Sequence, residues 1–354
     1  MPSPSAPPEA TWPGLISSLL QGRDLAAAEA AWAMDEVMSG NASAVALAGF
    51  LVALRAKGES VAEVQGLADS MLAHAVGVDL PGPAVDIVGT GGDRAFTVNL
   101  STMAALAIAG AGVPVVKHGN RASSSKSGSA DVLEALGVNL KLDVPRIAAV
   151  YREVGIAFLF ALVFHPSMRH AAVARRELGV GTVFNFLGPL TNPARPGAAA
   201  IGCSDPAMAP LMAGVLAARG ARALVFRGLA DGLDELAATG PSQIWEVRDG
   251  AVSEHVVDGA DLGLDRIAVG DLRGADANHN AAVARRFLAG EPGAVRQTVL
   301  FNAAAGIVAD GRLAGVAEGD LADRLRAGIV HAERAVDSGA AAALLDRWVA
   351  ASNG

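Results

Sequence analysis

The sequence is poor in cysteine, in long apolar stretches and in positive charge, and each shortage excludes a class of protein. Cys203 is the single cysteine, which rules out an internal disulfide and predicts a buried structural thiol in a cytoplasmic protein. No apolar run reaches about 18 residues, so no membrane span is expected, and the N-terminus lacks a signal-peptide pattern. Lys and Arg number 28 against 36 Asp and Glu, and this net charge of −8 argues against a general nucleic-acid binder.

Several common catalytic motifs are also missing. The run Gly89–Arg94 breaks the G-x-G-x-x-G dinucleotide pattern at its last glycine, and no G-x-x-x-x-G-K-[ST] phosphate loop occurs. The sequence has no H-E-x-x-H or Cys/His cluster for zinc and no G-x-S-x-G turn for a serine hydrolase. Rossmann dehydrogenases, P-loop NTPases, zinc enzymes and serine hydrolases of these types are therefore not supported.

What is present suffices for one large or two modest packed domains. The 354 residues are 52% hydrophobic and 18% charged, which is too apolar for disorder. Residues 1–11 are predicted to form a Pro-rich flexible tail, and apolar residues recur at helical spacing from 12 to 80. Ser60 and Glu63 have the spacing of a capping box at the start of one of these helices.

Residues 81–354 alternate strand-like and helix-like runs, which predicts an α/β domain with a mostly parallel central sheet covered on both faces. The expected strands are 84–88, 113–116, 156–160, 198–202, 223–226 and 243–247. The expected helices are 103–109, a short one near Asp131 that ends at Gly137, 206–219, 278–289, 298–309, 321–338 and 340–351.

The stretch Asp86–Leu136 concentrates glycine, hydroxyl and cationic residues. A buried strand runs into the glycines of 89–92, which can adopt positive φ, and then into a helix that Asn99 or Ser101 can cap. A glycine-rich loop that leads into a helix N-terminus is a natural anion site. A second strand, ending at Lys117–Arg121, leads into the polar loop 123–129 in the same way.

The charges in this stretch favour a phosphate pocket over a pair of ordinary solvated loops. Between Arg94 and Ala130 there are four Lys and Arg residues and no Asp or Glu. Both loops follow the carboxyl ends of strands, where open α/β sheets bind their ligands.

The order of the motifs resembles the anthranilate phosphoribosyltransferase family over nearly the whole chain. The matching segments are Gly89–Asp93, Asn99–Thr102, Lys117–Arg121 with its serine loop, Gly179–Pro193 and Asp231–Glu235. A pyrimidine nucleoside phosphorylase shares the fold and the phosphate chemistry, but the intact HGNR turn and the Asp–Glu pair favour the transferase. A nucleic-acid-binding protein on the same scaffold is the second alternative, and the net charge weighs against it.

The resemblance implies a fold like that of nucleoside phosphorylases and phosphoribosyltransferases. A small helical domain, 12–80 joined by about 166–193, would carry a homodimer interface, and 81–354 would bind phosphoribosyl diphosphate. The implied reaction transfers the 5-phosphoribosyl group to the amine of anthranilate in tryptophan biosynthesis. The partners would be these two small molecules, with no nucleic acid and no membrane.

The resemblance also implies a magnesium site, with two Mg²⁺ ions in each subunit. Asp234 and Glu235 are the family's metal pair, and Ser101 is the further ligand. Without the resemblance, the acidic pair could equally be an exposed turn or a helix start, and Ser101 a helix-capping hydroxyl.

The remaining site residues are carried over by the same resemblance. Gly89, Asn120 and Arg175 would contact anthranilate, with Arg175 forming a bidentate pair with its carboxylate. His118 could accept or orient a proton, although a neutral aromatic amine is already nucleophilic and positioning should dominate catalysis. The implied contacts of phosphoribosyl diphosphate are Gly89, Gly92, Asp93, Thr97, Asn99, Leu100, Ser101, Thr102, Lys117, Ala122, Ser123, Ser124, Ser125 and Ser129.

Three segments depart from the family pattern. Arg94 stands where a glycine usually follows the loop, which could add a phosphate contact or reduce mobility. Leu162–Phe164 replaces proline and polar residues, which puts the shape of the acceptor pocket in doubt. Arg227–Ala230 replaces a His-Gly pair and is one residue longer, so the metal carboxylates could shift.

Overall fold

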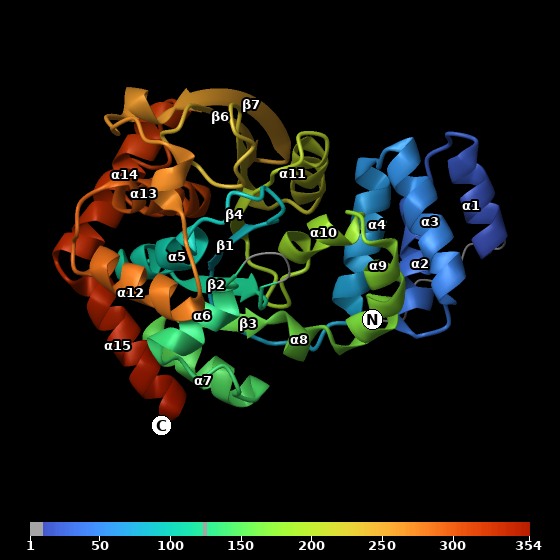
Figure 1. Cartoon of the computed structure of the whole chain (residues 1–354), viewed down its shortest axis with the longest axis horizontal. Helices are drawn as coiled ribbons and strands as arrows, with labels where there is room; N and C mark the ends of the chain where they lie inside the picture. The colour runs from blue at the N-terminus through green and yellow to red at the C-terminus, as the bar shows by residue number, and fades with distance from the viewer. Residues whose placement is uncertain (1–9, 123–125) are drawn as a thin grey trace. The chain divides into compact units, whose positions relative to one another are not determined.

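The computed structural model describes residues 10–122 and 126–354, which form two compact units. One unit contains the described residues up to Gly77 together with Ala161–Pro193, and the other contains Val78–Phe160 with Ala194–Gly354. The first unit is helical and the second is an α/β unit built on a mostly parallel sheet, so the expected fold class is confirmed (Figure 1).

The helical unit is formed by four N-terminal helices and by a later segment of the chain. Ser43 caps one helix by accepting a hydrogen bond from the Ala46 N–H at 3.1 Å, and Gly58 ends the same helix at φ 89°. The later segment packs back on the early helices, because α9 contacts α3. The elements are α1 (Trp12–Leu20), α2 (Ala27–Met38), α3 (Ala44–Lys57), α4 (Val61–Ala73), α8 (Ala161–Phe164), η1 (Pro166–Ala171), α9 (Ala172–Leu178), α10 (Phe184–Leu187) and η2 (Gly188–Leu190).

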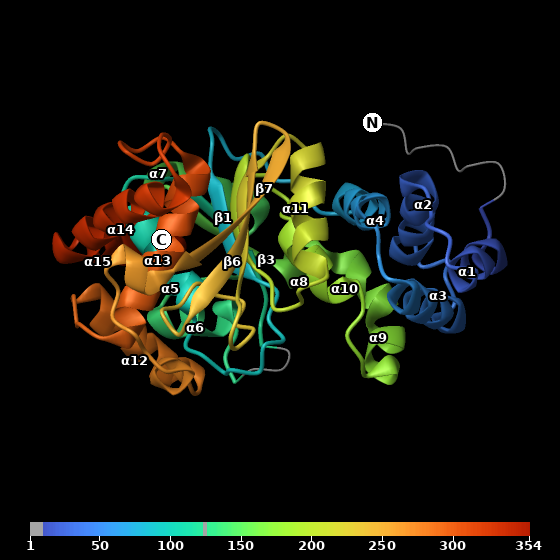
Figure 2. The same ribbon diagram turned by 90° about the horizontal axis from the view of Figure 1, so that it is seen from above.

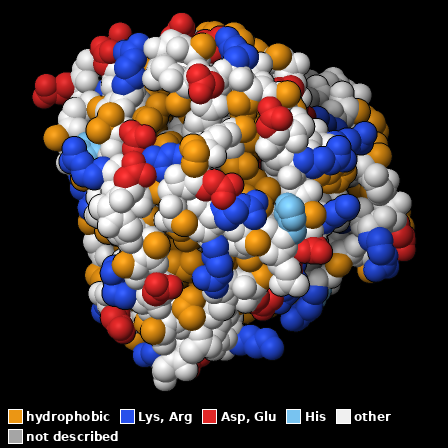
Figure 3. Space-filling model, turned by 60° about the vertical axis from the view of Figure 1, so that its left-hand side comes forward, with side chains coloured by type: hydrophobic (Ala, Val, Ile, Leu, Met, Phe, Trp, Pro, Cys, Tyr) orange, Lys and Arg blue, Asp and Glu red, His pale blue; other side chains and the backbone are white. Residues whose placement is uncertain are grey.

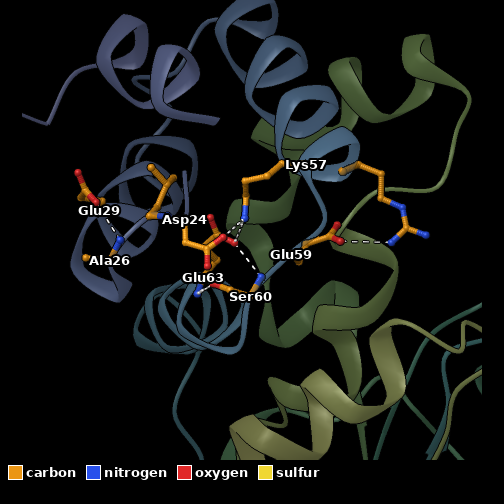
Figure 4. Close-up of polar contacts among 9 residues, drawn as sticks. Asp24, Ala26, Glu29, Lys57, Glu59, Ser60 and Glu63 are labelled. Atoms are coloured by element: carbon orange, nitrogen blue, oxygen red, sulfur yellow. Dashed lines mark hydrogen bonds and ion pairs between the residues drawn. The ribbon is translucent and has the colours of Figure 1, made fainter. Parts of the chain in front are cut away.

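A buried carboxylate joins the loops of this unit (Figure 4). The Glu63 side chain is 0% exposed and accepts hydrogen bonds from the Leu25 N–H at 2.8 Å and the Ser60 N–H at 2.7 Å. The Lys57 ammonium lies 2.9 Å away and supplies the opposite charge. The Glu63 N–H in turn donates to the Ser60 hydroxyl, so the predicted capping box is confirmed.

The α/β unit contains a seven-stranded sheet in the order β3-β2-β1-β4-β5-β6-β7. The first five strands in this order are parallel to one another, β6 pairs antiparallel with β5, and β7 pairs antiparallel with β6. The chain builds outward from β1 to β3 and then returns to place β4 on the other side of β1, so the topological switch point lies between β1 and β4. The strands are β1 (Val85–Gly89), β2 (Val115–Gly119), β3 (Ile156–Phe160), β4 (Ala198–Gly202), β5 (Arg222–Gly228), β6 (Pro241–Arg248) and β7 (Ala251–Asp258).

Helices cover the sheet and complete a single apolar core in this unit. Helices α5 and α13 pack on β1 and on each other, with α14 and α15 against α5, while α11 packs on β5 and β6 (Figure 2). Helix α14 is also tied to the sheet by a buried bidentate ion pair, in which Arg324 donates to the Glu246 carboxylate at 2.5 and 2.7 Å. The helical elements are α5 (Leu100–Gly110), α6 (Ser129–Leu136), α7 (Val144–Val154), α11 (Met208–Ala218), η3 (Gly259–Leu262), η4 (Val269–Leu272), α12 (Ala277–Leu288), α13 (Ala294–Asp310), α14 (Leu321–Asp337) and α15 (Ala340–Asn353).

The structure differs from the expected elements most clearly in one added strand, one added helix and one shifted strand. Strand β7 and helix α7 were not predicted; β7 is an edge strand whose side chains are mostly exposed, so it lacks an apolar signal. The second strand lies at Val115–Gly119 rather than 113–116, so Lys117 and His118 belong to the strand and not to the loop after it. Gly137 ends α6 in the left-handed conformation, as expected.

The surface carries both signs of charge. On the face drawn in Figure 3, Lys and Arg side chains are interspersed with Asp and Glu. No helix among the described residues has the length and apolar character needed to cross a membrane.

Candidate functional site

The site begins at the switch point, where the glycine ends of β1 and β4 receive the segment Asp234–Glu235. The Gly91 N–H donates to the Asp234 carboxylate at 2.6 Å. A Cβ at Gly89 would overlap this carboxylate, and one at Gly202 would overlap the Asp234 carbonyl oxygen. Gly89 is therefore required for close approach and not for positive φ, whereas Gly91 and Gly92 do have φ of 70° and 91°.

Asp234 and Glu235 are both buried, and Asp93 adds a third carboxylate beside them. Burial, followed by the charge and hydrogen bond of Asp93, raises the pKa of Asp234 to about 8. Burial and the neighbouring Asp234 likewise raise the pKa of Glu235, although Lys117 and the backbone N–H of Ser101 oppose that shift. The carboxylates of Asp93, Asp234 and Glu235 thus have one ammonium beside them, that of Lys117, and a bound cation would stabilise this group of charges.

Lys117 is the buried cation of the site. It is 2% exposed, and its ammonium donates to the Ile87 carbonyl and to the Ser101 hydroxyl, the latter at 3.1 Å. Burial lowers the pKa of Lys117 to about 8, with Asp86 and Glu235 opposing the shift. Because successive side chains of a strand point to opposite faces, the His118 side chain faces away from Lys117. The backbone N–H of His118 donates to the Asp86 carboxylate at 3.1 Å.

The N-terminus of α5 supplies backbone donors on the same side. Asn99 is the N-cap residue, but its side chain makes no capping hydrogen bond, and Ser101 lies inside the helix. The Asn99 amide instead donates to the Ser127 carbonyl at 3.0 Å, which ties the start of α5 to the second loop. Leu100 and Thr102 have buried side chains, so Leu100 could contact a ligand only through its backbone.

The second loop is braced by the start of α6. The Ala122 and Gly128 N–H groups both donate to the Asp131 carboxylate, at 3.1 and 2.8 Å. Arg121, one of the four cations of this stretch, forms ion pairs with Asp131 and Glu134 of α6. Asn120 is exposed, and its carbonyl accepts from the N–H of Ala130 and, at 3.5 Å, from the Ser129 hydroxyl; Ser123, Ser124 and Ser125 lie outside the described residues.

Three further residues that the sequence singles out are Arg175, Arg94 and Cys203. Arg175 belongs to the helical unit, on α9, where its guanidinium lies 5.2 Å from the centre of the Phe184 ring. Arg94 is exposed, with φ 60° and no ion pair among the described residues, so the departure from glycine produces a left-handed arginine. Cys203 is buried just beyond β4, as expected, and burial raises the pKa of its thiol to about 12.

Two buried amides that the sequence reasoning missed brace the site. Asn302 on α13 accepts from the Leu236 N–H at 3.1 Å and donates to the Leu236 carbonyl at 2.8 Å, directly after the acidic pair. Asn280 on α12 donates to the Asn99 side chain at 2.9 Å. A polar residue within an apolar helical stripe, as at Asn302, is the signal that could have indicated the first.

The donor set of this site fits a divalent cation bound together with phosphate. The described residues contain no group of three His, Cys, Asp or Glu side chains placed to hold a metal alone. Mg²⁺ commonly takes only one or two carboxylates and completes its shell with substrate phosphate and water. The Asp234–Glu235 pair and the Ser101 hydroxyl meet that requirement, since all three belong to the group around Lys117.

The fold and the site define a glycosyltransferase. Residues 81–342 match the model of the glycosyl transferase family a/b domain, and residues 13–75 match the helical bundle domain of the same family.

Named relatives narrow the class further. An Arthrobacter anthranilate phosphoribosyltransferase is 60% identical over 97% of both chains, and a Nocardioides one is 58% identical over 97% of this chain and 99% of its own. The solved anthranilate phosphoribosyltransferase of Thermus thermophilus is 42% identical, with a TM-score of 0.88 over 96% of this chain and 99% of its own. The chain belongs to the anthranilate phosphoribosyltransferase family, and it is a phosphoribosyl-transferring glycosyltransferase.

Proposed function

We propose that the chain transfers the 5-phosphoribosyl group of phosphoribosyl diphosphate to the amine of anthranilate, a step of tryptophan biosynthesis. The new bond joins the amine nitrogen to the anomeric carbon, the bond from that carbon to the diphosphate oxygen breaks, and the amine loses one proton. The products are N-(5-phosphoribosyl)anthranilate and diphosphate. The observation that carries the proposal is the buried Asp234–Glu235 pair, beside Lys117 at the N-terminus of α5, in a chain of this family.

Structures of yeast members support the choice of substrates. One, which is 27% identical with a TM-score of 0.85 over 98% of both chains, is a complex with phosphoribosyl diphosphate and magnesium. Another, 25% identical over 97% of this chain and 98% of its own, is a complex with 4-fluoroanthranilate. We therefore assign the same two substrate classes to this chain.

Asp234, Glu235 and Ser101 would hold magnesium, and we propose two ions in each subunit. Magnesium supplies positive charge that neutralises the diphosphate leaving group. Lys117 adds a fixed charge for phosphate, and the backbone N–H groups of the glycine loop add directional donors. The further proposed contacts of phosphoribosyl diphosphate are Gly89, Gly92, Asp93, Thr97, Asn99, Leu100, Thr102, Ala122, Ser123, Ser124, Ser125 and Ser129.

We propose that anthranilate is contacted by Gly89, Asn120 and Arg175, and that the Arg175 guanidinium binds the carboxylate of anthranilate. His118 is a candidate to accept or orient a proton. Its side chain lies on the face of β2 opposite to that of Lys117. We also propose a homodimer through the helical unit, which the exposed Val45 and Val52 of α3 support, and a cytoplasmic location.

The test is the loss of anthranilate fluorescence when the protein is mixed with anthranilate, phosphoribosyl diphosphate and Mg²⁺. Each component is omitted in turn, and thymidine with inorganic phosphate serves as the control for nucleoside phosphorylase activity. A signal that requires all components supports the proposal. A folded protein that gives no signal, or that cleaves thymidine instead, would overturn it.

A further inference from the structure

Asn280 links a distant helix to the proposed phosphoribosyl site. It lies on α12, 181 positions along the chain from Asn99, and is 2% exposed. Its amide nitrogen donates to the Asn99 side-chain oxygen at 2.9 Å, and its own oxygen accepts from the Ala275 N–H at 2.9 Å. The Asn99 nitrogen then donates to the Ser127 carbonyl at 3.0 Å, which completes a chain of three hydrogen bonds.

The two backbone groups at the ends of this series of three hydrogen bonds determine the orientation of both side-chain amides. The Ala275 backbone N–H can only donate, so the Asn280 atom beside it must be oxygen. The Ser127 carbonyl can only accept, so the Asn99 atom beside it must be nitrogen. Between these fixed ends, only one arrangement lets Asn280 donate to Asn99 without placing two oxygens or two nitrogens together.

The fixed orientation limits what Asn99 can offer to a ligand. Its oxygen accepts from Asn280, and one of its two amide hydrogens is directed to Ser127. The second amide hydrogen is oriented by the same two bonds, so Asn99 can meet a substrate as a donor. A donor suits the oxygens of a phosphate or a ribose.

The segment before Asn280 is packed closely against the same loop. The Val98 N–H donates to the Leu272 carbonyl at 2.9 Å, and the Gly274 N–H donates to the Phe96 carbonyl at 2.8 Å. A Cβ at Gly274 would lie 2.8 Å from the backbone carbonyl oxygen of Thr97 and 2.9 Å from the side-chain oxygen of Asn280. Only glycine lets these two segments approach so closely, and this approach brings Asn280 within reach of Asn99.

We propose that Asn280 is a positioning residue that holds Asn99 as a hydrogen-bond donor to phosphoribosyl diphosphate. This inference deepens the proposed function and rests on it. Asn280 acts through Asn99, so replacing Asn280 should weaken the binding of phosphoribosyl diphosphate while leaving the KM for anthranilate nearly unchanged. A side chain that only stabilised the fold would not show this selectivity or this dependence on Asn99.

A double-mutant cycle tests the inference through the Kd of phosphoribosyl diphosphate, measured by calorimetry with Mg²⁺ and without anthranilate. Asn280→Ala and Asn99→Ala should each raise the Kd by roughly five- to tenfold. In the Asn99→Ala background, Asn280→Ala should change the Kd by less than about twofold, because its partner is already gone. Asn278→Ala, at an exposed position on the same helix, is the matched control and should leave the Kd unchanged.

Asn280→Asp provides a second cycle if the alanine variant does not fold. The aspartate is nearly isosteric and still accepts from Ala275, but it cannot donate to Asn99. Its added charge acts in both backgrounds, so the cycle removes that contribution.

The possible results separate the two hypotheses. Independent, multiplying effects in either cycle, or an unchanged Kd in a folded Asn280 variant, would overturn this inference alone. Failure of the unaltered protein to bind phosphoribosyl diphosphate would overturn the proposed function, and this inference with it.

Discussion

Replacement of Asn302 by leucine should loosen the acidic segment of the site and destabilise the α/β unit. Asn302 is 0% exposed on α13, and its amide pairs with both the N–H and the carbonyl of Leu236. It donates in addition to the Thr298 carbonyl at 2.9 Å, so both of its hydrogens are used. Leucine matches asparagine approximately in volume but can make none of these bonds.

The expected cost follows from what the substitution leaves unpaired. The Leu236 N–H and carbonyl would lose the partners shown here while Leu236 remains buried, and an unsatisfied buried polar group costs about 1–3 kcal/mol. Two such groups give a loss of about 2–6 kcal/mol in the free energy of unfolding. This is a large part of the total of about 5–15 kcal/mol that is typical of a folded domain. Leu236 follows Glu235 directly, so we also expect the half-saturating Mg²⁺ concentration to rise several-fold.

Urea unfolding followed by tryptophan fluorescence can isolate the effect. Trp245 and Trp348 belong to the α/β unit, whereas Trp12 and Trp32 belong to the helical unit and can be replaced by phenylalanine. In that background, Asn302→Leu should lower the unfolding midpoint strongly.

Asn278→Leu, at an exposed position of α12, is the control and should have little effect. The reasoning would be refuted if Asn302→Leu changed the unfolding free energy by less than about 0.5 kcal/mol, within the range of ordinary surface substitutions.

Three further predictions concern charge and backbone strain. Burial raises the pKa of Glu246, but the hydrogen bonds and the charge of Arg324 outweigh burial, so the pKa is lowered overall. The ion pair therefore stabilises the folded state fully above the ordinary pKa of 4.5, and this contribution is lost as the pH falls. Between pH 6 and pH 3 the urea midpoint should fall less in Glu246→Gln than in the unaltered protein, and an equal fall would contradict this. Arg175→Ala should raise the KM for anthranilate at least about tenfold and more than that for phosphoribosyl diphosphate, since it removes a bidentate carboxylate contact; equal changes would exclude the assignment. Arg94→Gly should be more stable than Arg94→Ala by about 1 kcal/mol, because both remove the charge but only glycine relieves the φ of 60°; equal melting temperatures would argue against strain.

The sequence was most informative where the structural signal is local. β3 (Ile156–Phe160) and β4 (Ala198–Gly202) have the predicted bounds, because short apolar runs between polar turns mark buried parallel strands. The Ser60–Glu63 capping box is likewise a contact between residues close in sequence. Strand β7 lacked such a signal, since it is amphipathic at most and lies at the sheet edge.

The candidate site was predictable as a set of segments and not as a geometry. A glycine-rich loop predicted backbone freedom, and Gly91 and Gly92 do adopt positive φ. Gly89 and Gly202 are required for a different reason, the approach of Asp234 from more than 30 residues further along the chain, and no local pattern encodes that approach. The sequence also suggested four cations for phosphate, but it could not show that Arg121 is paired with the acids of α6.

The amides that brace the site show why such residues escape a reading of motifs. Asn280 and Asn302 lie 181 and 66 positions from Asn99 and Leu236, the residues they hold, and neither belongs to a segment that resembles a binding loop. A buried amide costs free energy unless its donors and acceptors are paired, so its presence on the buried face of a helix implies a specific polar partner. In both cases that partner lies in or beside the proposed substrate-binding segments. We infer that the helices covering the sheet do more than bury its apolar face, because they also fix the polar groups at the ends of its strands.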